Sequence, residues 1–225
     1  MKRFLSRAAL GAVLVLGSTF TLPALEIYQG VESGYYGDVA GLLRFSVREV
    51  SERVPVGLRV LAGAIYQFDS GDATLARRIF INDNTGGTVE KYGLNLLVGL
   101  DLTYRLAGGT DLSLHAYGGP RGSFYSAHYT FVGNNEAFAV RSNAFGAGGG
   151  AAAVLRIAER VTGTLNAGVD YFFPAKLYGH GTYYYTPDGV DQNPRNDYTY
   201  EDADAAVNQP RLVLAVTLGL EYLLK

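Results

Sequence analysis

The chain has 225 residues, a formal net charge of −2 and no cysteine. A charge this close to neutral provides no basic surface, so a nucleic-acid partner is excluded. Without cysteine no disulfide can stabilise the fold, and stability has to come from the architecture itself.

The first 24 residues have the features of a cleaved secretory signal peptide. Basic residues precede an apolar run, and a small residue then offers a cleavage site: Lys2, Arg3 and Arg7, then Ala8 to Gly17, then Ala24. The run is half the roughly 20 residues that a membrane-spanning helix needs, and no longer apolar block follows, so no transmembrane helix is expected. Cleavage removes those three positive charges, so the formal charge falls from −2 to −5, and residues 25–225 are enough for one domain.

The mature part is dominated by alternating apolar and polar residues, the period of a two-faced β-strand. The uninterrupted apolar registers lie in 39–48, 56–68, 92–106, 112–118, 145–157, 161–173 and 212–224. No charged residue occurs in any of these registers. A weaker eighth strand lies in LEIYQGVESGYYG, where Gln29 interrupts the apolar register of Ile27, Val31 and Tyr35.

The connections between these strands alternate in length. The joins at REVSERVP, AGGT and AER are short and belong to one end of the sheet, whereas 69–90, 122–141 and 174–210 are long and belong to the other. Only the join near Asp38 is short at the second end. Short periplasmic turns and long external loops are typical of outer-membrane barrels. The sequence therefore predicts an all-β fold, an antiparallel eight-stranded up-and-down transmembrane β-barrel over residues 25–225.

The opposite register carries the charges of these strands, with both signs and no lysine. Its members are Glu32, Arg44, Arg48, Arg59, Asp101, Arg105, His115, Arg156, Asp170, Arg211 and Glu221. A soluble calyx such as a lipocalin would bury the aliphatic register and expose the opposite register to water. That opposite register should then be rich in Lys and Glu. A lipid-facing register must instead exclude charge, because Arg or Lys at the bilayer midplane costs ~2–4 kcal/mol. The leucines are therefore predicted to face lipid, and the charges to face inward.

Aromatic residues stand where these strands would leave the membrane. Tyr66, Phe68, Tyr92, Phe145, Tyr171 and Phe173 lie at the outer ends, and Tyr104 and Tyr222 at the inner ends. These are the positions of the aromatic girdles of membrane barrels.

With these features the chain resembles the small eight-stranded outer-membrane barrels of the OmpA transmembrane domain, OmpX and OmpW types, over about residues 25–225. Its most specific segment is the last strand, TLGLEYLL, which looks like the assembly signal of such barrels at Thr217, Gly219, Tyr222 and Leu224. The family usually ends on an aromatic residue, whereas this chain ends on Lys225. The resemblance implies the outer membrane of a Gram-negative-type envelope, with outer-membrane lipid, lipopolysaccharide and the assembly machinery as partners.

The inward charges could line a gate or fill a plug. Eight strands enclose a space just wide enough for side chains, and buried arginines need partners, so the plug is favoured. In FGAGGGAAA, Gly146, Gly148, Gly150 and Ala152 leave room for long side chains from facing strands. The predicted interior polar network is Glu32, Arg44, Arg59, Asp101, Arg105, His115, Arg156, Asp170, Arg211 and Glu221.

The histidines give no catalytic site. Barrel deacylases use a His with a Ser two residues later. Here the residue two positions after His115 is Tyr117, and the residue two positions after His128 is Thr130. His180 lies in a loop. No nucleophile, base and orienting group can be named together, so an enzyme is not expected.

The loop at 174–210 is acidic and rich in tyrosine. Its oxygen ligands are Asp188, Asp191, Asp197, Glu201, Asp202 and Asp204, which match no EF-hand. No cofactor is expected and a solvated loop is favoured, with calcium as the alternative. The tyrosines suit recognition of an external protein partner. A hairpin in this loop, with GTYYYT as one arm, would extend the barrel wall outward.

The sequence thus favours an outer-membrane barrel that serves as a structural or surface-interaction component, with a plugged interior. The alternative is a narrow channel or transporter for small or apolar solutes. A lipid-modifying enzyme on the lipid face ranks third.

Overall fold

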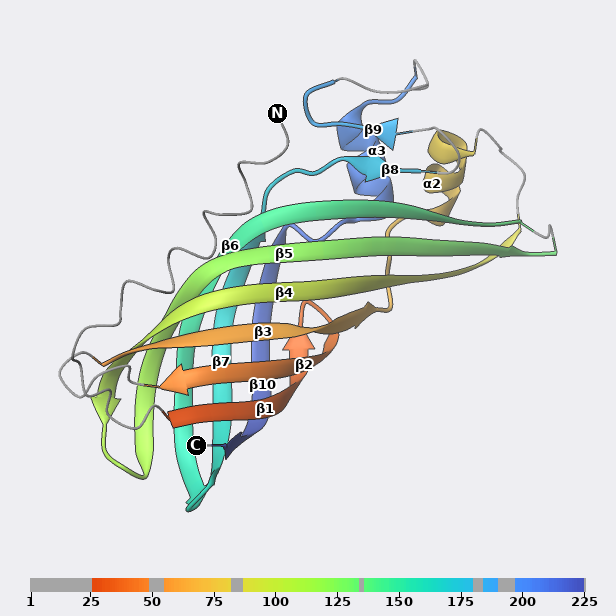
Figure 1. Ribbon diagram of the computed structural model, residues 1–225. Coiled ribbons are helices and arrows are strands. Elements are labelled where there is room, and N and C mark those ends of the chain that lie inside the picture. The colour runs from red at the N-terminus through yellow and green to blue at the C-terminus, as the bar shows by residue number, and fades with distance from the viewer. Residues whose placement is uncertain are drawn as a thin grey trace, which may run out of the picture.

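The architecture is that of a computed structural model, which describes residues 26–48, 55–81, 87–133, 136–179, 184–189 and 197–224 (Figure 1). The predicted signal peptide and its cleavage site lie outside these residues. The ring strands are β1 (Glu26–Tyr36), β2 (Val39–Arg48), β3 (Val56–Gln67), β4 (Thr88–Gly108), β5 (Leu112–Val132), β6 (Glu136–Ala158), β7 (Val161–Phe172) and β10 (Leu212–Leu223). Two short strands, β8 (Leu177–Tyr178) and β9 (Tyr184–Tyr185), extend the sheet beyond β6.

The eight ring strands pair antiparallel with their neighbours in the chain, and the ring closes where β1 pairs with β10. This seam runs from Tyr28 opposite Leu223 to Tyr36 opposite Ala215. The predicted fold class, an eight-stranded up-and-down barrel, is therefore confirmed. Neither helix among the described residues is long and apolar enough to cross a membrane.

Both ends of the ring, and the turns that join β4 to β5 and β6 to β7, lie at one end of the barrel. β1 begins and β10 ends beside the turn of Glu159 and Arg160, where the Leu223 amide donates to the Arg160 carbonyl at 2.9 Å. The β4–β5 turn follows Gly108, whose φ of 115° is available to glycine at little cost. The longer segments project from the opposite end, so we refer to the turn end as the periplasmic end and to the other as the external end.

The two faces of the barrel wall are as predicted. Along β4 the leucines of the outward register and Val98 are exposed, whereas Leu97 and Asp101 are buried in the lumen. From Tyr92 to Tyr104 there are twelve residue steps, which at about 3.3 Å each and a tilt of about 40° rise roughly 30 Å. That height matches the apolar thickness of a bilayer.

The outer girdle is a continuous line of ring contacts. Tyr66 stacks on Tyr92 with ring centroids 5.6 Å apart, and Tyr92 stacks on the His128 ring at 4.7 Å. Phe68 packs edge-on against Tyr66 at 5.1 Å. Three neighbouring strands, β3, β4 and β5, are thereby joined by side chains at the height where they leave the apolar zone.

The external loop predicted at 122–141 is wrong. β5 continues to Val132 and β6 starts at Glu136, so only residues 133–135 lie between the two strands. β4, β5 and β6 are 21, 21 and 23 residues long and rise well beyond the other strands (Figure 1). The apolar outward register stops at the girdle because these extensions stand in water, and exposed polar residues replace it: Thr88, Glu90, Thr130, Arg141 and Asn143.

The other two predicted loops are partly ordered as well. The segment 69–90 contains helix α2 (Ala73–Phe80), started by the Asp72 carboxylate, which accepts from the amides of Thr74 and Leu75. The segment 174–210 contains helix α3 (Tyr200–Val207), which begins with a capping box of Thr199 and Asp202. The predicted outward hairpin is confirmed by the pairing of β9 with β8 and of β8 with β6.

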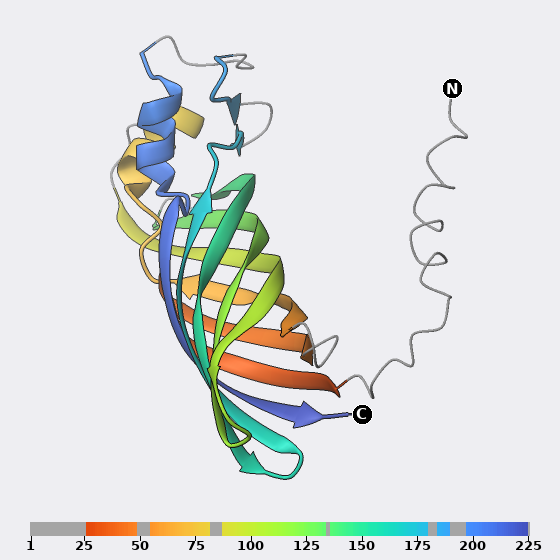
Figure 2. The same ribbon diagram turned by 90° about the vertical axis from the view of Figure 1, so that its left-hand side faces the viewer.

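These helices and the β8–β9 hairpin pack against the inner faces of the strand extensions and form a cap over the external end (Figures 1 and 2). Its core contains Ala76, Ile79, Phe80, Tyr125, Tyr129, Phe131, Phe138, Val140, Leu177, Tyr185, Tyr200, Ala203, Ala206 and Val207. The Tyr129 hydroxyl donates to the Ser70 carbonyl at 2.6 Å, and the Tyr125 hydroxyl donates to the Val207 carbonyl at 3.1 Å. Tyr185 and Tyr200, two of the tyrosines that suggested a recognition surface, therefore stabilise this cap.

The assignment of faces is tested by Val98→Arg, which places a charge on the lipid side at mid-height. We expect this variant to lose ~2–4 kcal/mol of folding free energy in lipid vesicles, measured by urea titration. The control is Thr103→Arg on the same strand but in the inward register, which should cost much less. Equal costs for the two variants would contradict this orientation.

Candidate functional site

The lumen contains a chain of ion pairs that we call the interior network. At its centre the fully buried Asp101 accepts from two arginines, with Arg59 Nε 2.7 Å from Oδ2 and Arg121 Nη1 2.7 Å from Oδ1. Arg121 Nε in turn lies 3.0 Å from Asp170 Oδ2, which also accepts from the Tyr36 hydroxyl. Both Asp101 oxygens thus have partners within the protein, as a buried charge requires.

The second half of the interior network lies closer to the seam. The Glu32 carboxylate pairs with Arg44 and accepts from Thr217 Oγ1 at 3.0 Å. The Glu221 carboxylate pairs with Arg48 and lies 3.7 Å from Arg44 Nη1. Because Glu32 and Glu221 come from the first and last strands, their ion pairs with β2 stabilise the closure of the ring.

Asn166 joins the two halves. Its Oδ1 accepts from Arg59 Nη1 at 3.3 Å, and its Nδ2 donates to Glu32 Oε1 at 3.1 Å. The interior network then has four carboxylates and four guanidinium groups, paired as Arg44 with Glu32, Arg48 with Glu221, Arg59 with Asp101 and Arg121 with Asp170. Its positive and negative charges balance, as expected of a plug.

The glycines of β6 provide the space that these side chains occupy. A Cβ on Gly148 would lie 1.6 Å from Asp170 Oδ1, and one on Gly150 would lie 2.7 Å from the Tyr117 hydroxyl. Tyr117 in turn packs against Arg59, with the guanidinium carbon 3.7 Å from the ring centroid. The predicted role of the FGAGGGAAA run, room for long side chains, is supported by these distances.

Sequence analysis placed Arg48 in the inward register but left it out of the predicted network. It did not name Arg121, Asn166 and Tyr36 at all. Arg121 follows Gly118, Gly119 and Pro120, which look like the end of a strand, yet it continues the inward register of His115 and Tyr117. Tyr36 continues the register of Glu32, and Asn166 continues that of Asp170. The same two-residue period that predicted the other members would have found all three.

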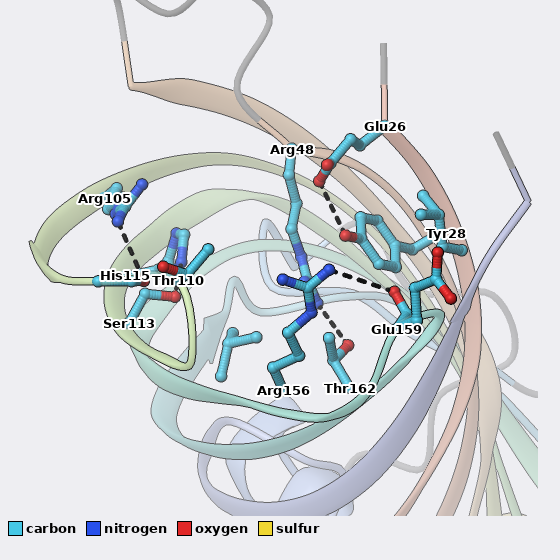
Figure 3. A pocket seen from close by; sticks show the side chains of 13 residues that line it. Glu26, Tyr28, Arg48, Arg105, Thr110, Ser113, His115, Arg156, Glu159 and Thr162 are labelled. Atoms are coloured by element: carbon cyan, nitrogen blue, oxygen red, sulfur yellow. Dashed lines mark hydrogen bonds between the residues drawn. The ribbon is translucent and has the colours of Figure 1, made fainter. Parts of the chain in front are cut away.

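Four of the predicted members lie outside the interior network. Arg211 is at the external end, 3.3 Å from Asp204 of α3. Arg105, His115 and Arg156 line a cavity of about 700 Å³ at the periplasmic end (Figure 3). Since this end is open to water, these three charges need not be desolvated.

The periplasmic cavity is polar and asymmetric. Arg105, Ser113 and His115 lie on one side, and Tyr28 and Glu159 lie on the other (Figure 3). Ser113 Oγ is 2.9 Å from His115 Nε2, a pair that a search for serine after histidine overlooks because Ser113 comes first. Arg105 Nη2 donates to the Gly108 and Gly109 carbonyls at 3.0 and 3.1 Å and thereby stabilises the β4–β5 turn.

An apolar layer separates the interior network from the external end. It consists of Tyr36, Ala40, Leu42, Leu61, Ile65, Leu97, Ala144, Phe172, Val213 and Ala215. These residues belong to the inward register, for which sequence analysis predicted a polar network and no separate apolar layer. Leu97 is 1% exposed and Phe172 is 0% exposed, so this layer is closely packed across the lumen.

The four residues of the proposed assembly signal do not share one face: two point into the barrel and two toward lipid. Thr217 points inward to Glu32, and a Cβ on Gly219 would lie 2.6 Å from Thr164 Oγ1. Tyr222 and Leu224 are exposed on the lipid side. The glycine is thus explained by packing inside the barrel, and recognition by the assembly machinery stays a prediction.

Several acidic residues of the segment 174–210 are used within the cap. Asp202 caps α3, and the hydrogen bonds from Thr199 hold the pKa of its carboxyl below the ordinary value. Asp204 pairs with Arg211 and accepts from Gln209. Asp191 and His180 lie outside the described residues, and within those residues no group of three His, Cys, Asp or Glu side chains could hold a metal ion.

Two solved structures were found to be similar to this chain. A major outer membrane protein from Thermus thermophilus is 25% identical, with a TM-score of 0.69 over 89% of this chain and 99% of that chain. Neisserial surface protein A is 9% identical, with a TM-score of 0.36 over 88% of this chain and 94% of that chain. No protein-family model and no curated protein matches the sequence. The Thermus protein confirms the resemblance to outer-membrane barrels and supports that class of protein for this chain.

The interior network is tested by Asp101→Ala, which leaves two buried guanidinium groups without their shared carboxylate. We expect a loss of ~3–5 kcal/mol in folding free energy, measured by urea titration in lipid vesicles. Arg105→Ala in the open periplasmic cavity is the control and should cost under ~1 kcal/mol. A larger loss for Arg105→Ala would show that the plug extends to the periplasmic end.

Proposed function

We propose that this protein is a non-conducting outer-membrane barrel that serves as a structural and surface-interaction component of a Gram-negative-type envelope. The observation that carries the proposal is the closed lumen. Two layers of side chains fill the lumen at different heights, the charge-balanced interior network and the apolar layer. A water path would have to break ion pairs in the first and wet the second.

The external end supports the surface role. The cap is held by its own apolar core, and α2 is tied to the sheet by the ion pair of Arg77 with Glu136. The Arg77 guanidinium also lies 4.2 Å from the centre of the Phe131 ring. A folded cap that stands on three extended strands presents a surface of fixed shape to the outside, which lowers the entropic cost of binding a partner.

Because the lumen is closed, the protein is expected to conduct no ions across a lipid bilayer. Single-channel recording of the refolded chain in a planar bilayer should give no steady openings, with folding verified by heat-modifiable gel mobility. The double variant Leu97→Ser and Phe172→Ser makes the apolar layer polar and should produce openings. Steady openings of the unmodified chain would favour the narrow channel instead.

The cap should be separable from the barrel. Ala206 is fully buried in the cap core, so Ala206→Arg would bury a charge between α3 and the sheet. We expect limited proteolysis of the segment 174–210 to become about tenfold faster or more, while the barrel keeps its heat-modifiable mobility. Ala205→Arg, exposed on the same helix, is the matched control and should leave the rate unchanged. If Ala206→Arg also unfolds the barrel, cap and barrel form one cooperative unit.

A further inference from the structure

One row of residues on the lipid face around the seam includes an amide side chain, that of Gln29. The strand registers place Phe45 opposite Gln29, Gln29 opposite Tyr222, and Tyr222 opposite Val161. This row crosses β2, β1, β10 and β7, the four strands around the seam (Figure 1). Because it contains Tyr222, it lies at the height of the predicted inner aromatic girdle. It therefore lies where lipid headgroups of the periplasmic leaflet meet their acyl chains.

A groove opens on the membrane side of this row. Its volume is about 290 Å³, and its outward-facing walls are Gln29, Val31, Leu43, Phe45, Val161, Leu220 and Tyr222. All of these except Gln29 are apolar or aromatic. The groove is thus shaped and lined for an acyl chain, with one amide at its periplasmic edge.

The Gln29 amide has no hydrogen-bond partner among the described residues, although Ser33 on the same face donates to the Ala40 carbonyl at 3.0 Å. An amide in this register is costly unless a polar group meets it. The Gln29 amide can donate to a phosphate or ester oxygen of a lipid.

A cation lies at the same edge. Arg160 directly precedes Val161, and its carbonyl accepts from the Leu223 amide at 2.9 Å, next to Tyr222 in the sequence. The guanidinium is fully exposed at the periplasmic turn. Arginine binds phosphate through strong charge-assisted hydrogen bonds.

We propose that this groove binds one glycerophospholipid of the periplasmic leaflet. The acyl chain lies along Val31, Leu43 and Leu220, and the phosphate is held by Arg160 and the Gln29 amide. The bound lipid would cover the seam where β1 meets β10. This inference rests on the lipid-facing register and not on the closed lumen, so either can fail alone.

The test is native mass spectrometry of the protein purified from membranes and titrated in detergent with palmitoyl-oleoyl phosphatidylglycerol. The unmodified protein should retain one lipid per chain. Arg160→Gln should weaken retention about tenfold, since it removes a charge-assisted contact. Gln29→Leu should also weaken it, although the change makes the groove more apolar. Arg78→Gln, exposed on α2 and far from the groove, should change nothing.

Several results would overturn the proposal. Unchanged retention in both groove variants would mean that the lipid is only part of the general annulus. Stronger retention in Gln29→Leu would mean that the groove selects acyl chains without the phosphate. Dimers that disappear in either groove variant would identify the occupant as a second copy of the chain. Heat-modifiable mobility verifies that each variant is folded.

Discussion

The structure depends on one constraint, that backbone amides and carbonyls inside a bilayer must be hydrogen-bonded within the protein. The sheet meets it by closing β1 on β10, so no strand edge of the described ring is left open to lipid. Closure with eight strands then sets the interior width, which is sufficient for side chains only. Because residues alternate along each strand, half of the wall must fill that interior, and its charges must find partners there.

The interior network meets this second requirement by sharing partners. Asp101 forms ion pairs with two arginines, and Arg121 forms ion pairs with two aspartates. A buried ion pair adds little stability over apolar packing, but removal of one partner is expensive. The network therefore penalises wrong strand register more than it strengthens the right one: a slip of one residue would turn Arg59 or Asp101 outward to lipid. We infer that register specificity is its main physical effect.

The sequence predicted correctly which residues of each strand face lipid and which face the lumen, but it did not predict how far the strands extend beyond the membrane. The two-residue period predicted the eight strands, the two faces of the wall and six members of the interior network. The period is clear because charged residues are excluded from the lipid-facing register. Arg121 was missed because Gly119 and Pro120 look like a turn, although the strand continues through them. The extensions of β4 to β6 were missed because the apolar residues change face beyond the girdle. On β5, Tyr125, Tyr129 and Phe131 are buried on the inward face and Thr130 is exposed, so the outward apolar register stops as it would at a loop.

The same three long strands explain how the external end is closed. Their inward register changes from polar in the interior network to apolar at Leu97, and aromatic residues such as Tyr125 and Tyr129 continue it above the membrane. An apolar face that leaves the barrel must be covered in water, and α2, α3 and the β8–β9 hairpin cover it. The cap is therefore the physical consequence of extending only part of the wall. Its position over the lumen follows from the inward direction of those side chains, so the helices that shield the sheet also lie above the mouth of the barrel.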